Sequence, residues 1–315
     1  MMEKTKDSWN LTATEPVMDA EKALQLKIKN AKVDSDENEQ WDKVIGPKNK
    51  LFDLNLKEVW RYMDLLMLLV RRDFVSFYKQ TILGPLWFLI QPLLTTAMYL
   101  LIFGRIAKVS TDGVPPLLFY MAGVTCWSYF SETLLKTSDT FIANANIFGK
   151  VYFPRLVIPL SIVISNLIRF GIQFSLFAAI WIGYMVAGKV HLTWAIALFP
   201  VLVVLMALLG LALGIIFSSL TTKYRDLRFL LTFGIQLLMF ATPVVYPLSL
   251  APEKYKWLIL ANPFTAIIET FRYGFLGQGE FSWVYLAYSA ISTIIILIIG
   301  VVIFNKYEKS FMDTV

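Results

Sequence analysis

The chain has 315 residues, of which 57% are hydrophobic and 17% charged, and its net charge is +6. Soluble proteins average about 45–50% apolar and about 25% charged residues, so this composition favours a polytopic membrane protein. One cysteine, Cys126, and one histidine, His191, exclude an intrachain disulfide framework, a cysteine-rich metal site and a histidine-pair metal site. The basic excess lies entirely after residue 80, around apolar segments, where membrane topology explains it better than nucleic-acid binding.

Residues 1–50 differ in character from the rest of the chain. Charged residues dominate, and no apolar run of the 7–15 residues that a signal peptide needs is present. We expect a mostly disordered cytoplasmic tail with a weak helix over 17–33. A docking arm for a partner is the alternative interpretation.

Residues 54–79 show apolar side chains at steps of three and four, the period of a helix, with basic residues on the opposite face. Such a helix beside a membrane span is typical of the interface plane, and packing against another protein domain is a compatible alternative. The residues that we expect to hold it at the interface are Trp60, Arg61, Arg71, Arg72 and Lys79.

Long uncharged stretches follow, each near the about 20 apolar residues that cross a bilayer as a helix. They predict an all-α fold with six transmembrane helices, at about 82–104, 114–135, 156–187, 193–220, 229–247 and 282–305. Pro85 and Pro92 predict a break or kink at the start of the first span. The 12-residue run 257–268 is too short to span, so residues 247–280 are interpreted as a re-entrant hairpin between spans five and six.

The orientation of the spans follows from the lysine and arginine residues of the short loops. With both termini in the cytoplasm, the inside loops carry ten such residues and the outside loops six, as the positive-inside rule requires. We therefore expect residues 51–315 to form one transmembrane domain with cytoplasmic termini.

Catalytic motifs are missing. The chain has no G-x-x-x-x-G-K-[ST] sequence and no acidic pair at a membrane boundary, so the sequence does not favour an enzyme. Charged residues inside apolar stretches remain to be explained, because each is costly in a bilayer. Asn166, Arg169 and Gln173 share one helical face, either lining a pore or subunit contact, or pairing with a neighbouring helix. Glu269 and Arg272 lie three residues apart, and the favoured interpretation is that they pair with each other.

Two inside loops, 144–155 and 221–228, combine basic and aromatic residues. Tyrosine, phenylalanine and arginine are common anchors at protein interfaces, so these loops suggest docking to a cytoplasmic protein. Membrane topology alone is the alternative explanation.

Several motifs now form a recognisable series in chain order. They are Phe52-Asp53-Leu54, Arg71-Arg72-Asp73, residues 78–87 (YKQTILGPLW), Asn144-Ala145-Asn146, residues 150–155 (KVYFPR), Tyr224-Arg225-Asp226-Leu227, Thr242-Pro243-Val244 and Asn262-Pro263. The series resembles ABC transporter permeases of the type-2 export class, in the branch that exports O-antigen, capsule and teichoic acid chains. The resemblance covers roughly residues 50–310 and leaves the tail and the stretch 166–173 unmatched.

The resemblance implies a homodimeric permease in a bacterial cytoplasmic (inner) membrane, bound to two copies of a P-loop ABC ATPase. ATP and Mg would be held by that ATPase, with no cofactor in this chain, and the exported substrate would be a polyprenyl-pyrophosphate-linked polysaccharide. The implied ATPase-coupling residues are Asn146, Lys150, Tyr152, Phe153, Pro154, Arg155, Lys223, Tyr224, Arg225 and Asp226. The implied extracytoplasmic gate residues are Pro243, Tyr246, Pro247, Glu269 and Arg272.

Aromatic rings stack on the apolar faces of sugars, so we expect Tyr99, Phe119, Tyr120 and Trp127 to line a sugar path, with Arg169 as a further candidate. Three other functions stay open: export of a lipid or drug on the same scaffold, a membrane-embedded glycopolymer enzyme, and a secondary transporter. The last would use internal repeats and mid-membrane ion ligands, and the sequence shows no repeat symmetry.

Overall fold

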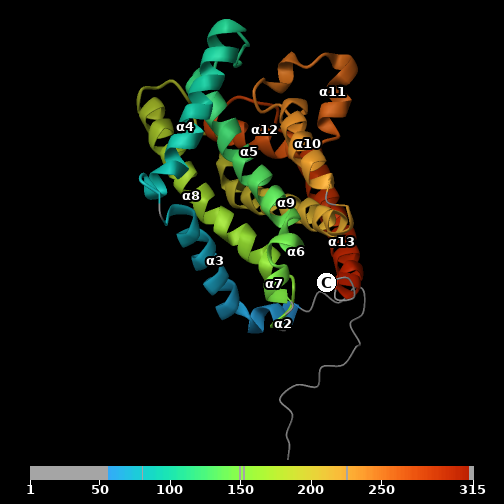
Figure 1. Ribbon diagram of the computed structural model, residues 1–315. Helices are drawn as coiled ribbons and strands as arrows, with labels where there is room; N and C mark the ends of the chain where they lie inside the picture. The colour runs from blue at the N-terminus through green and yellow to red at the C-terminus, as the bar shows by residue number, and fades with distance from the viewer. Residues whose placement is uncertain (1–55, 80, 149, 152, 225, 312–315) are drawn as a thin grey trace, which may run out of the picture. The chain divides into compact units, whose positions relative to one another are not determined.

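Helices form all the regular structure of the described residues, as the composition predicts (Figure 1). The computed structural model describes residues 56–79, 81–148, 150–151, 153–224 and 226–311. The chain divides into two units, Met1–Asn49 and Lys50–Val315, and every described residue belongs to the second. The predicted tail and the coupling candidates Tyr152 and Arg225 lie outside the described residues.

The amphipathic segment forms two helices, α2 (Leu56–Arg61) and α3 (Met63–Tyr78). Leu66 and Val70 of α3 are buried in an apolar cluster with residues of α8 (Val157–Val186), whereas Met67 and Leu68 stay exposed. The expected interface residues Trp60, Arg61, Arg71, Arg72 and Lys79 are all exposed. The apolar residues of this segment therefore form two groups. One group packs against the rest of the protein, and the other is exposed on the surface.

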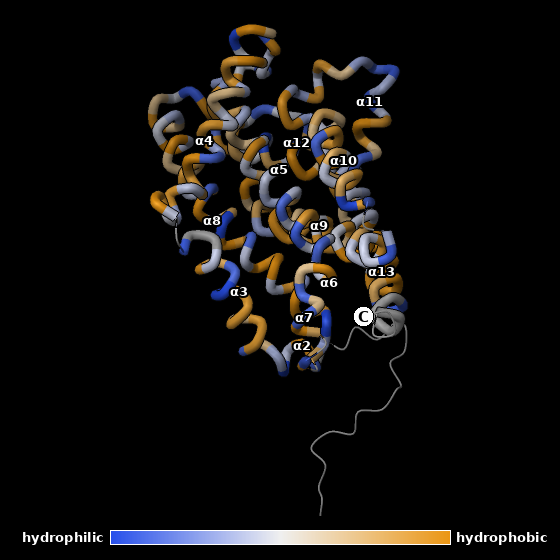
Figure 2. Tube along the Cα trace, in the orientation of Figure 1, coloured by the Kyte–Doolittle hydropathy of each residue, from blue (hydrophilic) through white to orange (hydrophobic). Residues whose placement is uncertain are grey.

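Four helical segments are long and apolar enough to cross a membrane: Gly84–Ile106, Val157–Val186, Trp194–Lys223 and Trp283–Lys306. The first comprises a 3-10 turn (Gly84–Leu86), α4 (Trp87–Tyr99) and a π-helical turn (Leu100–Ile106), so the expected break at Pro85 coincides with a change of helix type. The third comprises a 3-10 turn (Trp194–Leu198) and α9 (Phe199–Lys223), and the fourth lies in α13 (Trp283–Phe311). Hydrophobic residues predominate along α9 and α13 (Figure 2).

The other two predicted spans also form helices, α5 (Pro116–Ser138) and α10 (Leu227–Ala241). Helix α10 is apolar but has only 15 residues. Helix α5 carries Glu132 and Lys136, and most of its residues are buried between α8, α9 and neighbouring helices. Glu132 and Lys136 form an ion pair near the end of α5 and stay partly exposed, which lowers the cost of their charges.

Short helices join the long ones at both ends of the bundle. Helices α6 (Thr140–Ala143) and α7 (Ala145–Phe148) follow α5 at the end where α2 lies. At the opposite end, a 3-10 turn (Leu248–Leu250), α11 (Glu253–Leu260) and α12 (Pro263–Leu276) connect α10 to α13 (Figure 1).

Glycines allow α9 to approach its neighbours closely. A Cβ atom at Gly214 would lie 2.5 Å from the Thr137 Cβ of α5, and one at Gly300 of α13 would lie 2.9 Å from the Ala212 carbonyl oxygen. Small residues of this kind let membrane helices gain van der Waals contact where lipid supplies no hydrophobic driving force. The close α5–α9 and α9–α13 contacts therefore require glycine at positions 214 and 300.

We predict that Gly214→Ala destabilises the protein, because the added methyl group forces α5 and α9 apart at a cost of about 1–3 kcal/mol. The matched control is Gly171→Ala on α8, where an added Cβ meets nothing within 4 Å. That change should be neutral or stabilising, since alanine favours a helix by about 1 kcal/mol over glycine. Thermal unfolding of the two purified variants in detergent measures the difference, and equal melting temperatures would contradict the prediction.

Candidate functional site

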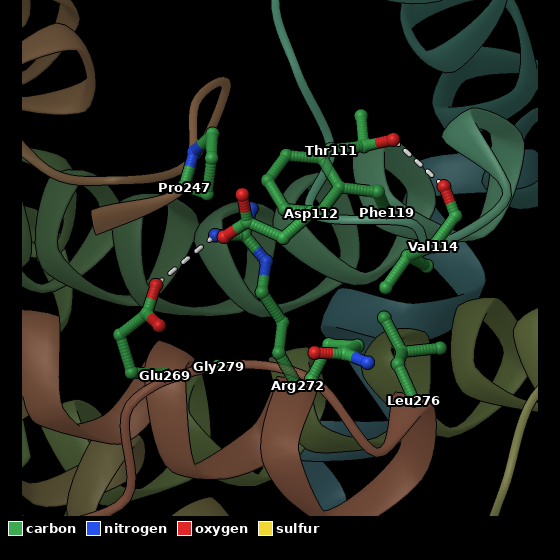
Figure 3. Close-up of a pocket in the computed structure, with 10 residues that line it drawn as sticks. Thr111, Asp112, Val114, Phe119, Pro247, Glu269, Arg272, Leu276 and Gly279 are labelled. Carbon is green, nitrogen blue, oxygen red and sulfur yellow. Dashed lines mark hydrogen bonds and ion pairs between the residues drawn. The ribbon is translucent and has the colours of Figure 1, made fainter. Parts of the chain in front are cut away.

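Arg272 of α12 is the centre of a buried polar cluster beside the turn that follows α10 (Figure 3). Its Nη1 donates to the Pro243 carbonyl oxygen at 2.6 Å, and its Nη2 donates to the Val244 carbonyl oxygen at 2.6 Å. A longer bond of 3.5 Å reaches the Tyr246 carbonyl oxygen. The guanidinium group therefore satisfies backbone carbonyls that no helix satisfies in this segment.

Glu269 balances the charge of Arg272. The Arg272 Nη1 lies 3.3 Å from the Glu269 Oε1, and both side chains are almost fully buried. The other carboxylate oxygen accepts a hydrogen bond from the backbone N–H of Glu280 at 3.2 Å. The pairing expected from the three-residue spacing is thus confirmed, and it forms one part of a larger network.

The sequence positions α12 by local signals at both ends. The Asn262 side chain caps the first turn by accepting from the Phe264 N–H at 3.0 Å, and Pro263 occupies the first helical position. The Asn262 side-chain nitrogen also donates to the Thr242 hydroxyl at 2.7 Å, which connects the start of α12 to the end of α10. Gly277 ends the helix with a φ of 72°, a left-handed conformation that glycine adopts readily.

Helix α5 forms the opposite wall of the cluster. The Arg272 guanidinium carbon lies 3.7 Å from the centroid of the Phe119 ring, a short cation–π contact. Gly123 lies one turn further along α5, and a Cβ there would lie 2.5 Å from the Val244 carbonyl oxygen. Only glycine fits at this position, so α5 is shaped to accept the segment that Arg272 holds.

Two polar contacts connect the surrounding loops. The Ser249 hydroxyl donates to the Asp112 carboxylate, with oxygen–oxygen distances of 2.8 and 3.0 Å. Lys256 of α11 forms a 2.7 Å ion pair with Glu280, and this hydrogen bond raises the pKa of Lys256. Asp112, Pro247, Glu269 and Arg272 all line one small cavity (Figure 3). The predicted gate residues Pro243, Tyr246, Pro247, Glu269 and Arg272 therefore lie together.

Arg169 of α8 belongs to a second network. Its Nη1 lies 3.3 Å from the Glu132 Oε2 of α5, and its guanidinium carbon lies 5.3 Å from the centroid of the Phe88 ring. The same Glu132 oxygen accepts from Lys136 at 3.1 Å, and Lys136 also donates to the Asn166 Oδ1 at 3.1 Å. Of the two interpretations of this polar face, pairing with a neighbouring helix is the one that these contacts support.

The aromatic residues expected along a sugar path lie mostly inside the subunit. Phe119, Tyr120 and Trp127 are buried in the main apolar core, where Trp127 packs against Phe264 at 5.4 Å between ring centroids. Tyr99 is half-buried, and its hydroxyl group lies 3.3 Å from the Met239 sulfur of α10. These rings pack the bundle in this arrangement, and their role in a sugar path stays a prediction.

The segment 144–155 divides into buried and exposed residues. Phe153 and Arg155 are buried, with the Arg155 guanidinium carbon 5.5 Å from the Phe148 ring centroid. Contacts between phenylalanine rings continue this packing from Phe148 through Phe141 to Phe304 of α13. Because their side chains face this chain, contact of Phe153 and Arg155 with an ATPase stays a prediction.

The exposed coupling candidates form the outer surface of the two loops. Asn146 and Lys150 are exposed and Pro154 is partly exposed, and in the second loop Lys223, Tyr224 and Asp226 are exposed. Val151 is 58% exposed, an apolar contributor to this surface that the basic-aromatic pattern did not single out.

Contacts that the sequence pattern missed join the second loop to the end of α5. The Arg228 Nη2 lies 2.9 Å from the Asp139 Oδ2, and the Thr221 hydroxyl donates to the Ser138 carbonyl oxygen at 3.0 Å. Burial raises the pKa of Asp139, and the positive charge of Arg228 partly offsets this increase. The opposite charges of Asp139 and Arg228 were the available signal, but 89 residues separate them in the chain.

The polar groups of these clusters hold helices and irregular segments of the chain together. Among the residues that the structure describes, no three histidine, cysteine or acidic side chains gather in a group that could hold a metal ion. The titratable side chains of the two networks are instead occupied by ion pairs and by backbone groups.

Comparison with known proteins identifies relatives over most of the chain. Residues 64–276 match the model of a family described as ABC-2 type transporter. The chain is 31% identical over 250 residues to an O-antigen export system permease protein of Klebsiella pneumoniae, covering 79% of this chain and 94% of that protein. It is 31% identical over 219 residues to an O-antigen export system permease protein of Myxococcus xanthus, covering 69% and 82%. A polysialic acid transport protein of Escherichia coli is 25% identical over 246 residues, covering 74% and 89%.

We predict that Arg272→Met strongly destabilises the protein, by about 3–5 kcal/mol, because it leaves the Glu269 carboxylate buried without its cation. Adding Glu269→Gln should recover part of the loss, since the neutral amide is less costly to bury. Thermal unfolding of wild type, single and double variants measures both effects. A single variant as stable as wild type, or a double variant less stable than Arg272→Met alone, would contradict the role assigned to this pair.

Proposed function

We propose that this chain, which belongs to the ABC-2 type transporter family, exports a lipid-linked polysaccharide from the bacterial cytoplasm. The relatives of the chain are named as transport permeases and not as enzymes. The similarity to O-antigen export permeases carries this proposal, since it extends over 94% of one relative. The likeness to a polysialic acid transport protein also favours a glycan polymer as cargo. The lipid carrier is proposed to be a polyprenyl pyrophosphate.

The energy source is proposed to be a separate ABC ATPase in two copies, which would bind ATP and Mg. This chain has no G-x-x-x-x-G-K-[ST] sequence of its own. Lys150, Val151, Lys223 and Tyr224 present an exposed surface of mixed basic and apolar character. Such a surface suits docking to the ATPase, with the buried Phe153 and Arg155 holding the loop in shape.

In the proposed membrane arrangement, the four apolar segments are joined by α5 and α10 to give six spans in the inner membrane. At about 1.5 Å per residue, α10 is about 23 Å long, so the turn after it would complete the crossing. The exposed apolar residues Met67 and Leu68 of α3 suit the membrane interface. Both termini would then lie in the cytoplasm, with α11 and α12 as re-entrant helices at the outer side.

A second copy of the chain is proposed to pack against α4 and α10. A side-chain contact between Tyr99 of α4 and Met239 of α10 links these helices. Their outward faces combine large apolar residues with the exposed amides of Gln91 and Gln236. Amide side chains are costly against lipid, so a face that carries them favours a partner subunit or a polar pathway over lipid.

Deletion of the gene tests the proposed function. We expect lipid-linked polymer to accumulate inside the cell and to disappear from the surface, because synthesis continues while export stops. Immunoblotting of the polymer in cell fractions measures this, and a plasmid copy of the gene should restore surface polymer. If polymer synthesis itself stops, a membrane-embedded glycopolymer enzyme would be the better interpretation.

For the ATPase surface, we predict that Lys150→Glu combined with Val151→Asp reduces co-purification of the ATPase by at least about tenfold. Losing one apolar anchor and reversing one charge removes more than the about 1.4 kcal/mol that this factor represents. Lys189→Glu, an exposed lysine in the loop between α8 and α9, is the matched control. Unchanged co-purification of the double variant would contradict the docking surface.

A further inference from the structure

Three charged side chains from two helices meet at one carboxylate oxygen where α5 and α8 pack together. The Glu132 Oε2 lies 3.1 Å from the Lys136 Nζ and 3.3 Å from the Arg169 Nη1. Glu132 and Lys136 occupy the last two turns of α5, and Arg169 lies on α8. One carboxylate therefore serves two cations.

These three side chains comprise two cations and one carboxylate. Lys136 and Arg169 contribute two positive charges against one negative charge from Glu132. The negative charge of Asp73 on α3 also attracts Arg169. The Asp73 carboxylate is, however, in an ion pair with Arg72 at 2.8 Å. Lys136 and Arg169 therefore share the Glu132 carboxylate, and a cation that shares its counter-charge near a membrane favours a further anion.

Lys136 is the cation that a ligand can reach. Its side chain is 39% exposed and that of Glu132 is 34% exposed, whereas that of Arg169 is only 8% exposed. An ammonium group has three N–H donors, and Lys136 uses two of them on Glu132 and Asn166. One donor on an accessible cation therefore remains for an anionic group.

The surroundings favour an anion carried on a lipid. Lys136 lies two residues from the end of α5, about 3 Å along the helix axis, and this end is followed by the loops proposed to lie in the cytoplasm. The Phe88 ring under Arg169 belongs to the start of α4, where Leu86 and Trp87 expose large apolar side chains. A cation beside exposed apolar residues suits a phosphate with a lipid tail.

We propose that Lys136, positioned by Glu132 and Asn166, binds a phosphate group carried on a lipid. This inference rests on the proposed function, in which the diphosphate of a polyprenyl-linked substrate is the phosphate that enters. A bulk phospholipid headgroup shares the same chemistry, so the test separates the two sources.

The test uses the permease with its ATPase in nanodiscs of phosphatidylcholine, with undecaprenyl diphosphate as the probe and native mass spectrometry as the binding measurement. Lys136→Gln should weaken binding by at least about tenfold, as expected for loss of a hydrogen bond to a charged group. Lys136→Arg should keep binding near wild type because it keeps the charge. Lys256→Gln is the matched control, since it breaks another lysine–glutamate pair outside this cluster.

Glu132→Gln gives an independent result of opposite sign. Glutamine keeps an oxygen that accepts from Lys136 but removes the negative charge, so the probe should bind more tightly. This result does not depend on whether Lys136→Gln folds. Equal binding by wild type and Lys136→Gln, or weaker or unchanged binding by Glu132→Gln, would overturn the proposal and leave the cluster as a clamp between α5 and α8.

Phosphatidylglycerol in the nanodiscs distinguishes the sources. If it does not displace the probe, the site selects the diphosphate of the substrate, and if it displaces the probe in a Lys136-dependent manner, the site takes phospholipid headgroups. Both results support a lipid phosphate site. The binding difference between variants does not depend on polymer export, so failure of the export proposal in the deletion experiment would be seen separately.

Discussion

Buried backbone groups must find their hydrogen-bond partners within the protein, and this constraint organises the end of the bundle where α10, α11 and α12 meet. The chain leaves helical geometry after Ala241, and the carbonyl oxygens of Pro243, Val244 and Tyr246 lose their helical donors. Arg272 supplies donors to all three from α12. The planar guanidinium group suits this task better than lysine would, because it presents several N–H groups in fixed directions.

The hydrogen bonds of Arg272 depend in turn on the charge of Glu269 and on the absence of a side chain at Gly123. Glu269 neutralises Arg272 at a site that is almost closed to solvent. Gly123 leaves the space that the Val244 carbonyl oxygen occupies beside α5. Since breaking one partner of a buried pair leaves an uncompensated charge, the loop, α12 and α5 are held as one unit.

Local sequence signals predicted what depends on neighbouring residues. The helical period gave the amphipathic segment, the apolar runs gave the long helices, and the three-residue spacing gave the pair of Glu269 and Arg272. Partners distant in the chain were beyond these signals, as with Glu132, which lies 37 residues before the Arg169 that it contacts. Hydropathy also cannot separate lipid-facing from protein-facing positions, because both are apolar, so the burial of Phe119 and Trp127 in the core needed the structure.

Helix α5 links the two charge networks. Its first turns contact Arg272 through Phe119 and accept the α10–α11 segment at Gly123, and its last turns carry Glu132 and Lys136. Asp139 at its end contacts Arg228 at the start of α10, so α10 meets α5 at both of its ends. Because α5 is a continuous helix of 23 residues, about 35 Å long, neither network can shift along the axis without straining the other. The charged residues of the two networks therefore lie where helices and irregular segments must be held together, on α5, α8 and α12.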